Sequence, residues 1–336
     1  MVFLWNNRKN TMIKSLYIRN FRGFRDFKID GFKRINLLIG IDRTNKSNIL
    51  EALSSFTIPF LRENTSKGLD QLIRLESETE LFYNGNYHDP ARIETELGFV
   101  QFSYEKTTGL QIKIETPADL GIYSVDDKLN VKFKRGDSYI SSIRKYAFQQ
   151  NIPQKKSYAR YLVPPFGTNI FNMIEQDEKL KKEVSSLFAE YRLNLVFDRA
   201  SQTLRIMQSE ENQNEIFLVP YNSIAETLQR IIFFKTAVVT NTDCVLLFEE
   251  PEAHSFPPCI SHVTQEIIHK KDNQYFIATH SPFILNDFLE NAREELAVYM
   301  VNYENHETNL RQLSDKELHD VYQYGVDLFT NSERYI

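Results

Sequence analysis

A lysine and a serine at the start of a helical pattern are the first residues of this sequence whose spacing indicates chemistry. Lys46 and Ser47 close the stretch GIDRTNKS, which follows a P-loop pattern except that Asn45 replaces its second glycine. In such a turn the lysine reaches the β- and γ-phosphates, and the serine hydroxyl binds Mg²⁺. The turn therefore predicts a site for ATP and Mg²⁺, although a strand, turn and helix that merely contain a lysine and a serine would look the same.

The phosphates are expected to meet backbone groups as well as side chains. The helix that begins at the turn offers unpaired N–H groups and the positive end of its dipole. Asparagine tolerates a left-handed backbone better than most non-glycine residues, so Asn45 weakens the match without removing it. The residues expected around the phosphates are Gly40, Asp42, Arg43, Thr44, Asn45, Lys46, Ser47 and Asn48.

Two adjacent carboxylates form the second chemical group. Glu249 and Glu250 follow the apolar run 245–248, which predicts a central parallel strand. Open α/β sheets bind ligands at the C-terminal edge of their strands. Glu249 is therefore expected to hold Mg²⁺ through water, and Glu250 to orient or deprotonate an attacking water. Two acids would also suit the cap of a following turn, but the upstream P-loop favours the catalytic interpretation.

A histidine forms the third group. The apolar run 275–278 predicts another strand, which ends in the sequence THSP with His280 in second place. A histidine beside a phosphate site can hydrogen-bond the γ-phosphate or the attacking water. An isolated histidine would more often be structural, but the order of P-loop, acidic strand and histidine strand favours a role at the phosphates.

The elements that must position these groups alternate between strands and helices. Apolar alternation and β-branched residues mark the strands, and apolar spacing of three or four residues marks the helices. The predicted strands are 13–20, 24–29, 35–39, 93–102, 110–114, 129–133, 193–197, 204–207, 245–248, 275–278 and 296–303. The predicted helices begin near Lys46 and cover 175–191 and 315–323.

Two groups of aromatic and basic residues leave alternatives open. Phe21, Arg22 and Phe24 lie around a predicted tight turn, where they would stack on an adenine ring or simply pack in a sheet. The segment 144–160 mixes cations and tyrosines, which would bind a nucleic-acid backbone or form a solvated face. Its members are Arg144, Lys145, Tyr146, Lys155, Lys156, Tyr158 and Arg160.

The composition is that of a large globular chain. With 336 residues, of which 42% are hydrophobic, it can bury one large core or two. The net charge of −5 argues against a uniformly basic nucleic-acid binder. Cys244 and Cys259 match no zinc or disulfide pattern and are expected to be reduced core residues. No stretch has the length of a membrane helix, and the first residues do not form a signal peptide, so a cytoplasmic location is expected.

Taken together, the motifs resemble one family. The stretch NFRGFRDFKIDGFKRINLLIG, the P-loop, LLFEEPEAH and THSP occur in the order found in ABC-type ATPase heads of the SMC, RecF and OLD kind. The chain is most similar to compact AAA-family ATPases related to the OLD proteins, and the resemblance spans nearly its whole length. It implies an α/β P-loop NTPase fold of the ABC/SMC-head type, with a mixed central sheet, an antiparallel β lobe and a helical lobe.

The resemblance also implies roles for single residues. Lys46 and Ser47 would bind phosphate and Mg²⁺, Glu249 would support the metal, Glu250 would be the catalytic base and His280 the switch histidine. Two heads of this family sandwich ATP, each P-loop facing a signature motif of the other head. We expect that signature at 222–230, with Ser223 as its phosphate contact, and we assign Gln101 as the glutamine that senses Mg²⁺.

The chain departs from the family pattern at the phosphate contacts. Asn45 replaces the P-loop glycine, Asp42 stands where asparagine is frequent, and the expected signature has no glycine. Backbone amides approach a γ-phosphate most closely where no Cβ intervenes, so slow hydrolysis is expected.

The expected organisation is an N-terminal extension, 1–11, and one ATPase domain, 12–336. The lobes of that domain are expected at 12–135, with the P-loop and antiparallel strands, at 136–217, as an inserted lobe, and at 218–336, with the signature, the acids and the histidine. No sustained heptads lie between residues 53 and 218, so a long coiled-coil arm of the SMC kind is not expected.

The function expected from the resemblance is an ATPase that forms a homo-oligomer, a dimer or higher, and controls an effector. No Toprim nuclease domain follows THSP, so the effector, a nuclease or a toxin, is expected to be separately encoded. The OLD-like resemblance implies anti-phage defence, with a phage protein or nucleic acid as trigger. A RecF-like DNA-repair ATPase and a nucleotide-locked scaffold without hydrolysis are the alternatives.

Overall fold

The computed structural model describes residues 12–40, 46–117, 119–136, 141–189, 192–208, 217–255, 257–304 and 307–329. The N-terminal extension and the P-loop residues Asp42, Arg43, Thr44 and Asn45 lie outside these ranges. What was expected of them stays a prediction.

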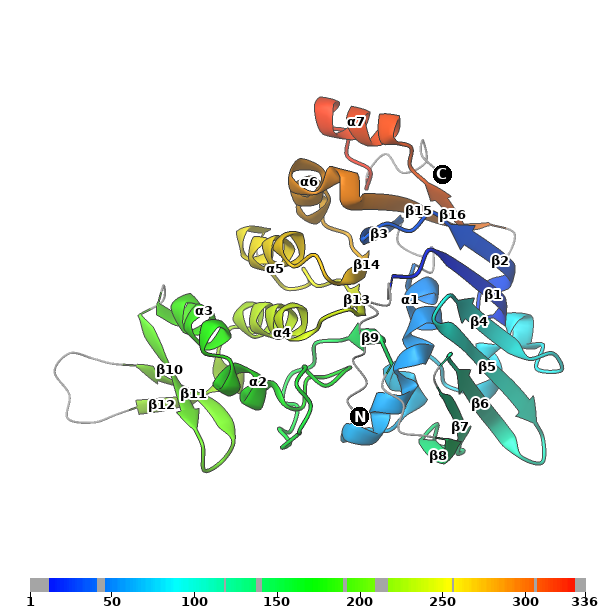
Figure 1. Ribbon diagram of the computed structural model, residues 1–336, viewed down its shortest axis with the longest axis horizontal. Coiled ribbons are helices and arrows are strands. Elements are labelled where there is room, and N and C mark those ends of the chain that lie inside the picture. Colours follow the sequence, from blue (N-terminus) through cyan, green and yellow to red (C-terminus); the bar gives the residue numbers. More distant parts are fainter. Residues whose placement is uncertain are drawn as a thin grey trace, which may run out of the picture.

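A six-stranded sheet occupies the middle of the molecule (Figure 1). Neighbouring strands run parallel except for the last hairpin, which is antiparallel. The apolar runs predicted at 35–39, 245–248 and 275–278 are three of its four inner strands, as expected for strands covered on both faces. In sheet order the strands are β16 (Glu307–Gln312), β15 (Leu296–Glu304), β3 (Ile35–Gly40), β14 (Gln274–Ala278), β13 (Val245–Glu249) and β9 (Ile143–Tyr146).

Alternate residues of these strands face two different cores. Leu37, Leu246 and Ile277 pack among the helices of one face. Leu38, Leu247 and Phe276 pack on the other face, against α1 and a second sheet. Because side chains alternate along a strand, this division fixes the register of each inner strand.

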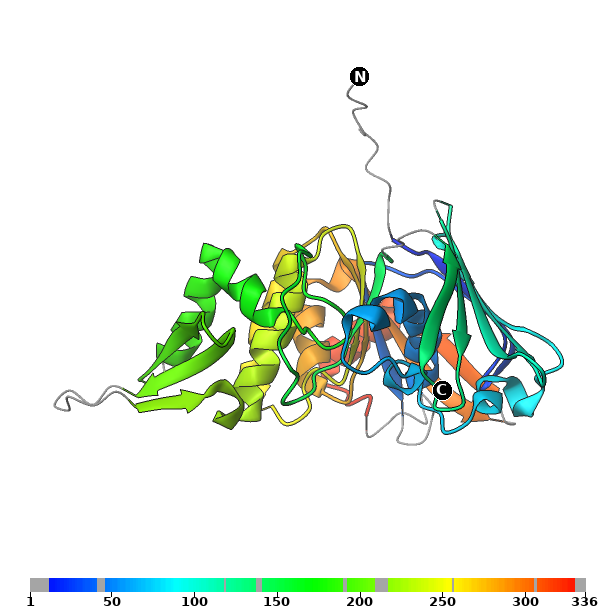
Figure 2. The same cartoon turned by 90° about the horizontal axis from the view of Figure 1, so that it is seen from below.

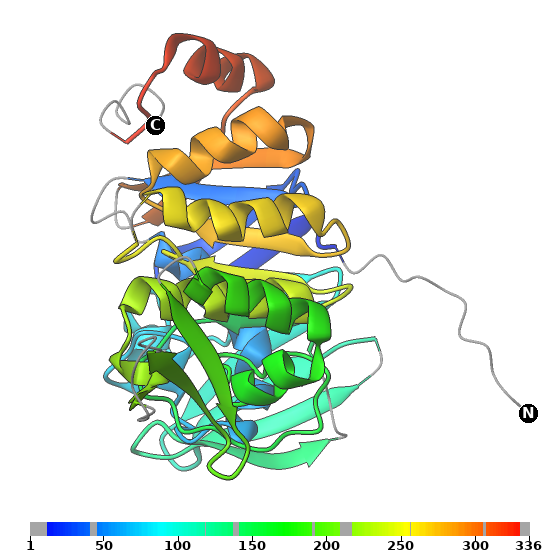
Figure 3. The same cartoon turned by 90° about the vertical axis from the view of Figure 1, so that its left-hand side faces the viewer.

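Helices cover the first face in a layer that Figure 3 shows from outside. α1 (Ser47–Ser54) alone lies on the opposite face and continues into a 3-10 helix, Ser55–Glu63. The helix predicted over 175–191 is in fact two helices, which meet at Asp177. The remaining helices are α2 (Ile170–Gln176), α3 (Glu178–Ala189), α4 (Glu226–Thr240), α5 (Pro257–His269), α6 (Pro282–Asn291) and α7 (Asp315–Tyr324).

A seven-stranded antiparallel sheet covers α1 and closes the second core (Figure 2). The strand predicted at 93–102 is really a hairpin that turns before Gly98. The strand at 120–125 was not predicted, and the strand at 131–136 was predicted at 129–133. In sheet order the strands are β2 (Phe24–Asp30), β1 (Ser15–Phe21), β4 (Ala91–Thr95), β5 (Gly98–Glu105), β6 (Gly109–Glu115), β7 (Leu120–Val125) and β8 (Val131–Gly136).

A small three-stranded sheet lies at the far end of the helical side, beyond α2 and α3 (Figures 1 and 2). It comprises β10 (Leu193–Asp198), β11 (Thr203–Gln208) and β12 (Phe217–Pro220). None of the helices in the described ranges combines the length and apolar character that a membrane crossing requires.

The hairpin between β4 and β5 predicts a position-specific loss of stability. Gly98 has φ +132°, and a Cβ there would lie 2.1 Å from the carbonyl oxygen of Glu115. We expect Gly98→Ala to lower the free energy of unfolding by about 3 kcal/mol, since it combines backbone strain with a clash. Gly85 is the control, because it has φ +70° with open space around its Cβ, so Gly85→Ala should cost only about 1 kcal/mol. Urea unfolding of both variants measures the difference, and equal losses would contradict the role of the clash.

Candidate nucleotide-binding site

The three predicted site elements meet at one edge of the central sheet. β3, β14 and β13 are neighbours and parallel, so Gly40, Ala278 and Glu249 end at the same edge. The backbone continues this contact beyond the strands, because the N–H of Glu250 donates to the carbonyl of Ala278 at 2.8 Å. Ligands of open α/β sheets bind at this edge.

Lys46 and Ser47 begin α1 directly at this edge. The Lys46 ammonium is buried and donates a hydrogen bond of 2.7 Å to the carbonyl of Gly40. The N-cap residue Lys46 makes no capping hydrogen bond to a described residue, and the first N–H groups of α1 are oriented for an anion. The side chain of Asn48 is buried and donates to Thr308, which leaves only its backbone for a phosphate.

Ser47 and Glu249 join the P-loop helix to the acidic strand. The hydroxyl of Ser47 donates to Oε1 of Glu249 at 2.7 Å. A hydroxyl and a carboxylate are the oxygen donors that Mg²⁺ uses with substrate phosphates and water. These two residues therefore suit Mg²⁺ that is bound together with a nucleotide. The described residues contain no group of three or more His, Cys, Asp or Glu side chains that would hold a metal ion without one.

Two cations compensate the charge of Glu249. Arg74 lies 2.5 Å from Oε1, and the ammonium of Lys145 lies 3.5 Å from Oε2. Burial raises the pKa of Glu249, but Lys145, the Ser47 hydroxyl and Arg74 together outweigh it and hold the pKa below its usual value. Glu249 is therefore held as a carboxylate. Neither cation could be assigned to Glu249 from the sequence, because both lie in segments far from the P-loop and the acidic strand.

Glu250 and His280 face each other beside this cluster. Nε2 of His280 lies 3.6 Å from Oε1 of Glu250, and the two side chains are 37% and 49% exposed. Glu250 has φ +43°, a left-handed conformation that is uncommon for a glutamate and occurs at functional turns. Both side chains are thus open to a ligand that arrives from solvent.

Glu252 ties the acidic turn to the histidine turn, and sequence reasoning missed it. Its Oε1 accepts from the Thr279 hydroxyl at 2.7 Å and from the His280 N–H at 2.8 Å. Burial raises the pKa of Glu252 despite these bonds. The third glutamate of EEPE was the available signal, because an acid directly after two functional acids is also brought to the sheet edge.

Gln101 does not join the site. It lies in β5 between Val100 and Phe102, which face the core that contains α1, so strand alternation turns Gln101 to the opposite face. Its amide donates to Ser103. The glutamines that the topology brings to the site edge are Gln149 and Gln150, which follow β9, the strand parallel to β13.

Ser223 stands apart from the other predicted residues. It is exposed at the end of the 3-10 helix Tyr221–Ser223, just ahead of α4. The resemblance assigns this residue to the nucleotide of a second copy, so its role stays a prediction.

The structure corrects part of what was expected of the two groups of aromatic and basic residues. Phe21 and Phe24 are core residues, so the packing interpretation holds for them and they are not available to an adenine ring. Arg144 and Lys145 are buried in β9 and cannot form a nucleic-acid face. Lys155, Lys156, Tyr158 and Arg160 are exposed.

Comparisons with known proteins agree with this geometry at the level of the fold. The structure is similar to an Smc head bound to the C-terminal winged-helix domain of ScpA, with a TM-score of 0.52, 12% identity, and coverage of 91% of this chain and 99% of that one. A Pyrococcus furiosus Smc head with an extended coiled coil gives a TM-score of 0.49, 11% identity, and coverage of 93% and 98%. The protein has the SMC-head-like, ABC-type P-loop fold.

Sequence similarity to curated proteins is confined to short segments. An ATP/GTP phosphatase of Helicobacter pylori is 50% identical over 42 residues, 12% of this chain and 11% of that protein. The uncharacterized protein MJECL10 of Methanocaldococcus jannaschii is 43% identical over 49 residues, 15% of this chain and 22% of that protein. The chain thus spans less than a quarter of the length of these relatives, and no family model matches it.

The largely buried Lys145–Glu249 pair predicts a pH-dependent loss of stability. Glu249 has a lowered pKa, so its contribution is present above its unfolded value, 4.5, and is lost as the pH falls through the lower folded value. Lys145→Met removes the first of its favourable charges and should destabilise the protein by up to about 3 kcal/mol at pH 7. In the variant Lys145 no longer offsets burial, so Glu249 takes up its proton at a higher pH than in the unmodified protein, and the loss should shrink as the pH falls toward 4.

Urea unfolding between pH 4 and 8 checks this expectation. The exposed pair of Lys113 and Glu115 supplies the control, because Lys113→Met should change stability little at any pH. A Lys145→Met loss that is the same at pH 4 and pH 7 would exclude the charge of Glu249 as its cause.

Proposed function

We propose that this protein binds ATP with Mg²⁺ and hydrolyses it slowly. The observation that carries the proposal is the 2.7 Å hydrogen bond between Ser47 and Glu249, which unites the P-loop helix with the acidic strand. The SMC-head-like fold supports it, because the strands that carry these residues are neighbours at the ligand-binding edge of the central sheet.

Each residue of the site has a task in this proposal. Lys46 leaves the carbonyl of Gly40 and binds the β- and γ-phosphates, while the first N–H groups of α1 hold phosphate oxygens. Ser47 and Glu249 would hold Mg²⁺, which when bound neutralises charge on the phosphates. Glu250 orients the attacking water and accepts its proton. His280 lies 3.6 Å from Glu250 and donates toward the γ-phosphate or that water.

Slow turnover is proposed from the phosphate contacts. Asn45 brings a Cβ to a position where the P-loop pattern has none, and the signature proposed at 222–230 contains no glycine. Both features keep backbone amides farther from the phosphates. Transition-state stabilisation in phosphoryl transfer depends on such contacts, so the rate is reduced.

Self-association through ATP is the second part of the proposal. Ser223 is exposed ahead of α4 and is well placed to meet a second copy. By resemblance to OLD-like ATPases, we propose a cytoplasmic homo-oligomer that controls a separately encoded nuclease or toxin in anti-phage defence. Purification of the chain with the products of its neighbouring genes tests this assignment, and an effector whose release or activity depends on ATP would support it.

Direct DNA binding is the alternative that one observation favours. Lys155, Lys156, Tyr158 and Arg160 are exposed in one segment, which suits a nucleic-acid backbone. Binding of duplex DNA that depends on ATP and weakens with salt would favour the repair function over the defence function.

The role of Glu250 predicts a trapped nucleotide. Glu250→Gln should lower the ATP turnover rate at least 100-fold, because the amide cannot accept a proton from water, while ATP binding persists. Lys46→Ala should instead lose ATP binding. Steady-state phosphate release and equilibrium binding of ATP separate the two variants. If Glu250→Gln turns over ATP at the rate of the unmodified protein, Glu250 is not the base.

The role of Ser223 predicts a loss of nucleotide-dependent association. Ser223→Glu places a carboxylate where the second copy's phosphates are proposed to lie, so ATP should no longer promote a dimer although each copy still binds ATP. Ser186→Glu adds the same charge on the exposed face of α3 and should dimerise normally. Sedimentation velocity with ATP measures both, best in the Glu250→Gln background. Dimers of equal stability in both variants would place Ser223 outside the interface.

A further inference from the structure

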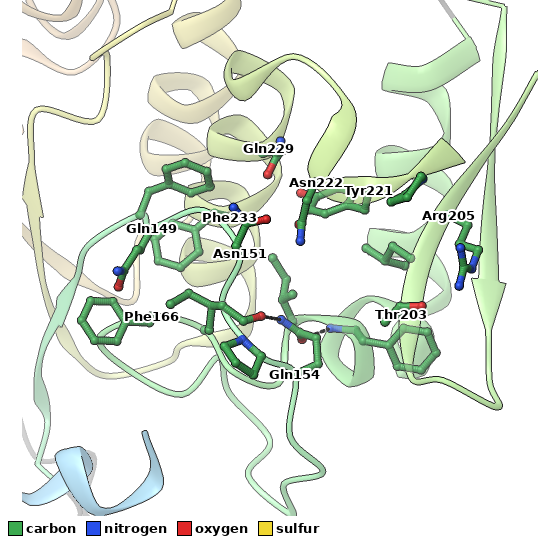
Figure 4. A pocket seen from close by; sticks show the side chains of 18 residues that line it. Gln149, Asn151, Gln154, Phe166, Thr203, Arg205, Tyr221, Asn222, Gln229 and Phe233 are labelled. Carbon is green, nitrogen blue, oxygen red and sulfur yellow. Dashed lines mark hydrogen bonds between the residues drawn. The ribbon is translucent and has the colours of Figure 1, made fainter. Parts of the chain in front are cut away.

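A cavity of about 340 Å³, within the size range of small-ligand pockets, is lined by none of Lys46, Ser47, Glu249, Glu250 and His280 (Figure 4). Three parts of the chain form it. They are the segment that follows β9, the elements α2, β11 and the end of β12, and the segment 221–233, which includes the first half of α4.

The floor of the cavity is aromatic and apolar. Phe166, Phe171 and Phe233 contribute rings that are at least nine-tenths buried, and Leu204 and Ile170 fill the space between them. Aromatic rings bind planar groups by stacked or edge-to-face contact. A flat ring is therefore the shape that this floor favours.

The polar groups of the cavity are carboxamides. Gln154 and Gln229 already bind the backbone, through Phe171 N–H at 3.3 Å and the Ile224 carbonyl at 2.9 Å. Within the described ranges, the amides of Asn151 and Asn222 have no hydrogen-bond partner, and Figure 4 shows them with Gln229 around the open space. A carboxamide offers a donor and an acceptor side by side.

The lining carries almost no free charge. Among the described residues that line it, Arg205 is the only one with an ionised side chain, and its Nε pairs with Asp198 at 3.1 Å. The enclosed part of a ligand is accordingly neutral, planar and equipped with both donors and acceptors.

We propose that this cavity binds one nucleobase. Stacking on aromatic side chains with hydrogen bonds from amides to the base edge is how proteins hold an unpaired base. Phosphates would remain outside, where Lys155 and Lys156 follow the cavity segment and are exposed. The base belongs either to a free nucleoside or nucleotide or to a single-stranded nucleic acid, since both present the same ring.

The cavity is connected to the segment that carries Ser223. Asn222 precedes Ser223 directly, and Gln150, beside the cavity residues Gln149 and Asn151, donates to Glu226 at 3.1 Å. A bound base thus contacts the segment proposed to meet a second copy, and occupancy should change ATP-dependent association. Base binding goes beyond the proposed ATPase and needs only the cavity, whereas its effect on association rests on the role proposed for Ser223.

Binding of nucleosides to the full chain without ATP tests the inference. Adenosine, guanosine, cytidine and uridine lack phosphates, so the P-loop helix offers them little, and Lys46→Ala should leave their binding unchanged. Calorimetry and saturation-transfer NMR should detect saturable binding of at least one nucleoside. A twelve-residue single strand, measured at 50 and 200 mM salt, forms the second arm.

The variants remove the amides or fill the space. Asn151→Gly and Asn222→Ala should each weaken binding roughly tenfold, the effect of one lost hydrogen bond at the upper end of its range. Asn84→Gly is the matched control, because Asn84 and Asn151 have φ +49° and +58° and both are exposed. Ile152→Trp should abolish binding by filling the mouth, and circular dichroism verifies that it folds.

The outcomes distinguish a free base from the base of a nucleic acid, and both from a proposal that is wrong. Saturable nucleoside binding that Ile152→Trp abolishes supports a free base, and salt-sensitive binding of the strand alone, lost in the same variant, supports a nucleic-acid source. The proposal is overturned if neither probe binds or if binding survives Ile152→Trp. It is also overturned if Ile152→Trp loses the binding of a protein partner and of no nucleoside or strand. Loss of ATP turnover in Glu250→Gln is independent of every one of these results.

Discussion

The site depends on keeping one largely buried carboxylate, that of Glu249, ionised. Glu249 ends an inner strand of the central sheet, where burial favours its neutral form. The hydroxyl of Ser47 and the cations of Lys145 and Arg74 reverse that preference. These partners come from α1, from β9 and from the segment after the 3-10 helix Ser55–Glu63. Glu249 therefore stays a carboxylate only when three separate parts of the chain are in place.

The central sheet brings those parts together through its two-sided core. Its inner strands send alternate side chains to the helices and to α1 with the second sheet, so neither face can slip by one residue without exposing a core. With the register fixed, the ends of β3, β14 and β13 lie at one edge. Glu252 then links the two outer turns through Thr279 and His280, which fixes the relative position of the acidic turn and the histidine turn.

The inner strands and the residues at their ends could be predicted because both signals are local. A run such as 245–248 is apolar only where both faces are covered, and Glu249 and Glu250 follow it directly. The contacts of Lys145 and Arg74 with Glu249 could not be predicted, since no local pattern in the sequence indicates a partner more than a hundred residues away. Gln101 was misplaced for a related reason. Alternation predicts that neighbours point to opposite faces, but only the structure shows that Val100 and Phe102 take the core face.

The two cations at Glu249 differ in what they contribute. The side chain of Arg74 is 68% exposed, and that of Lys145 is 8% exposed. Solvent screens an exposed pair, so Arg74 can leave at little cost, whereas a buried pair that loses one partner is strongly destabilised. Arg74 also occupies Oε1, the same oxygen that Ser47 contacts and that a cation between Ser47 and Glu249 would require. Lys145 contacts Oε2 and therefore does not compete with a cation for Oε1. The arrangement therefore separates two functions on one carboxylate: Lys145 favours its ionised form, and Arg74 neutralises the oxygen that the proposed nucleotide-bound cation would take over.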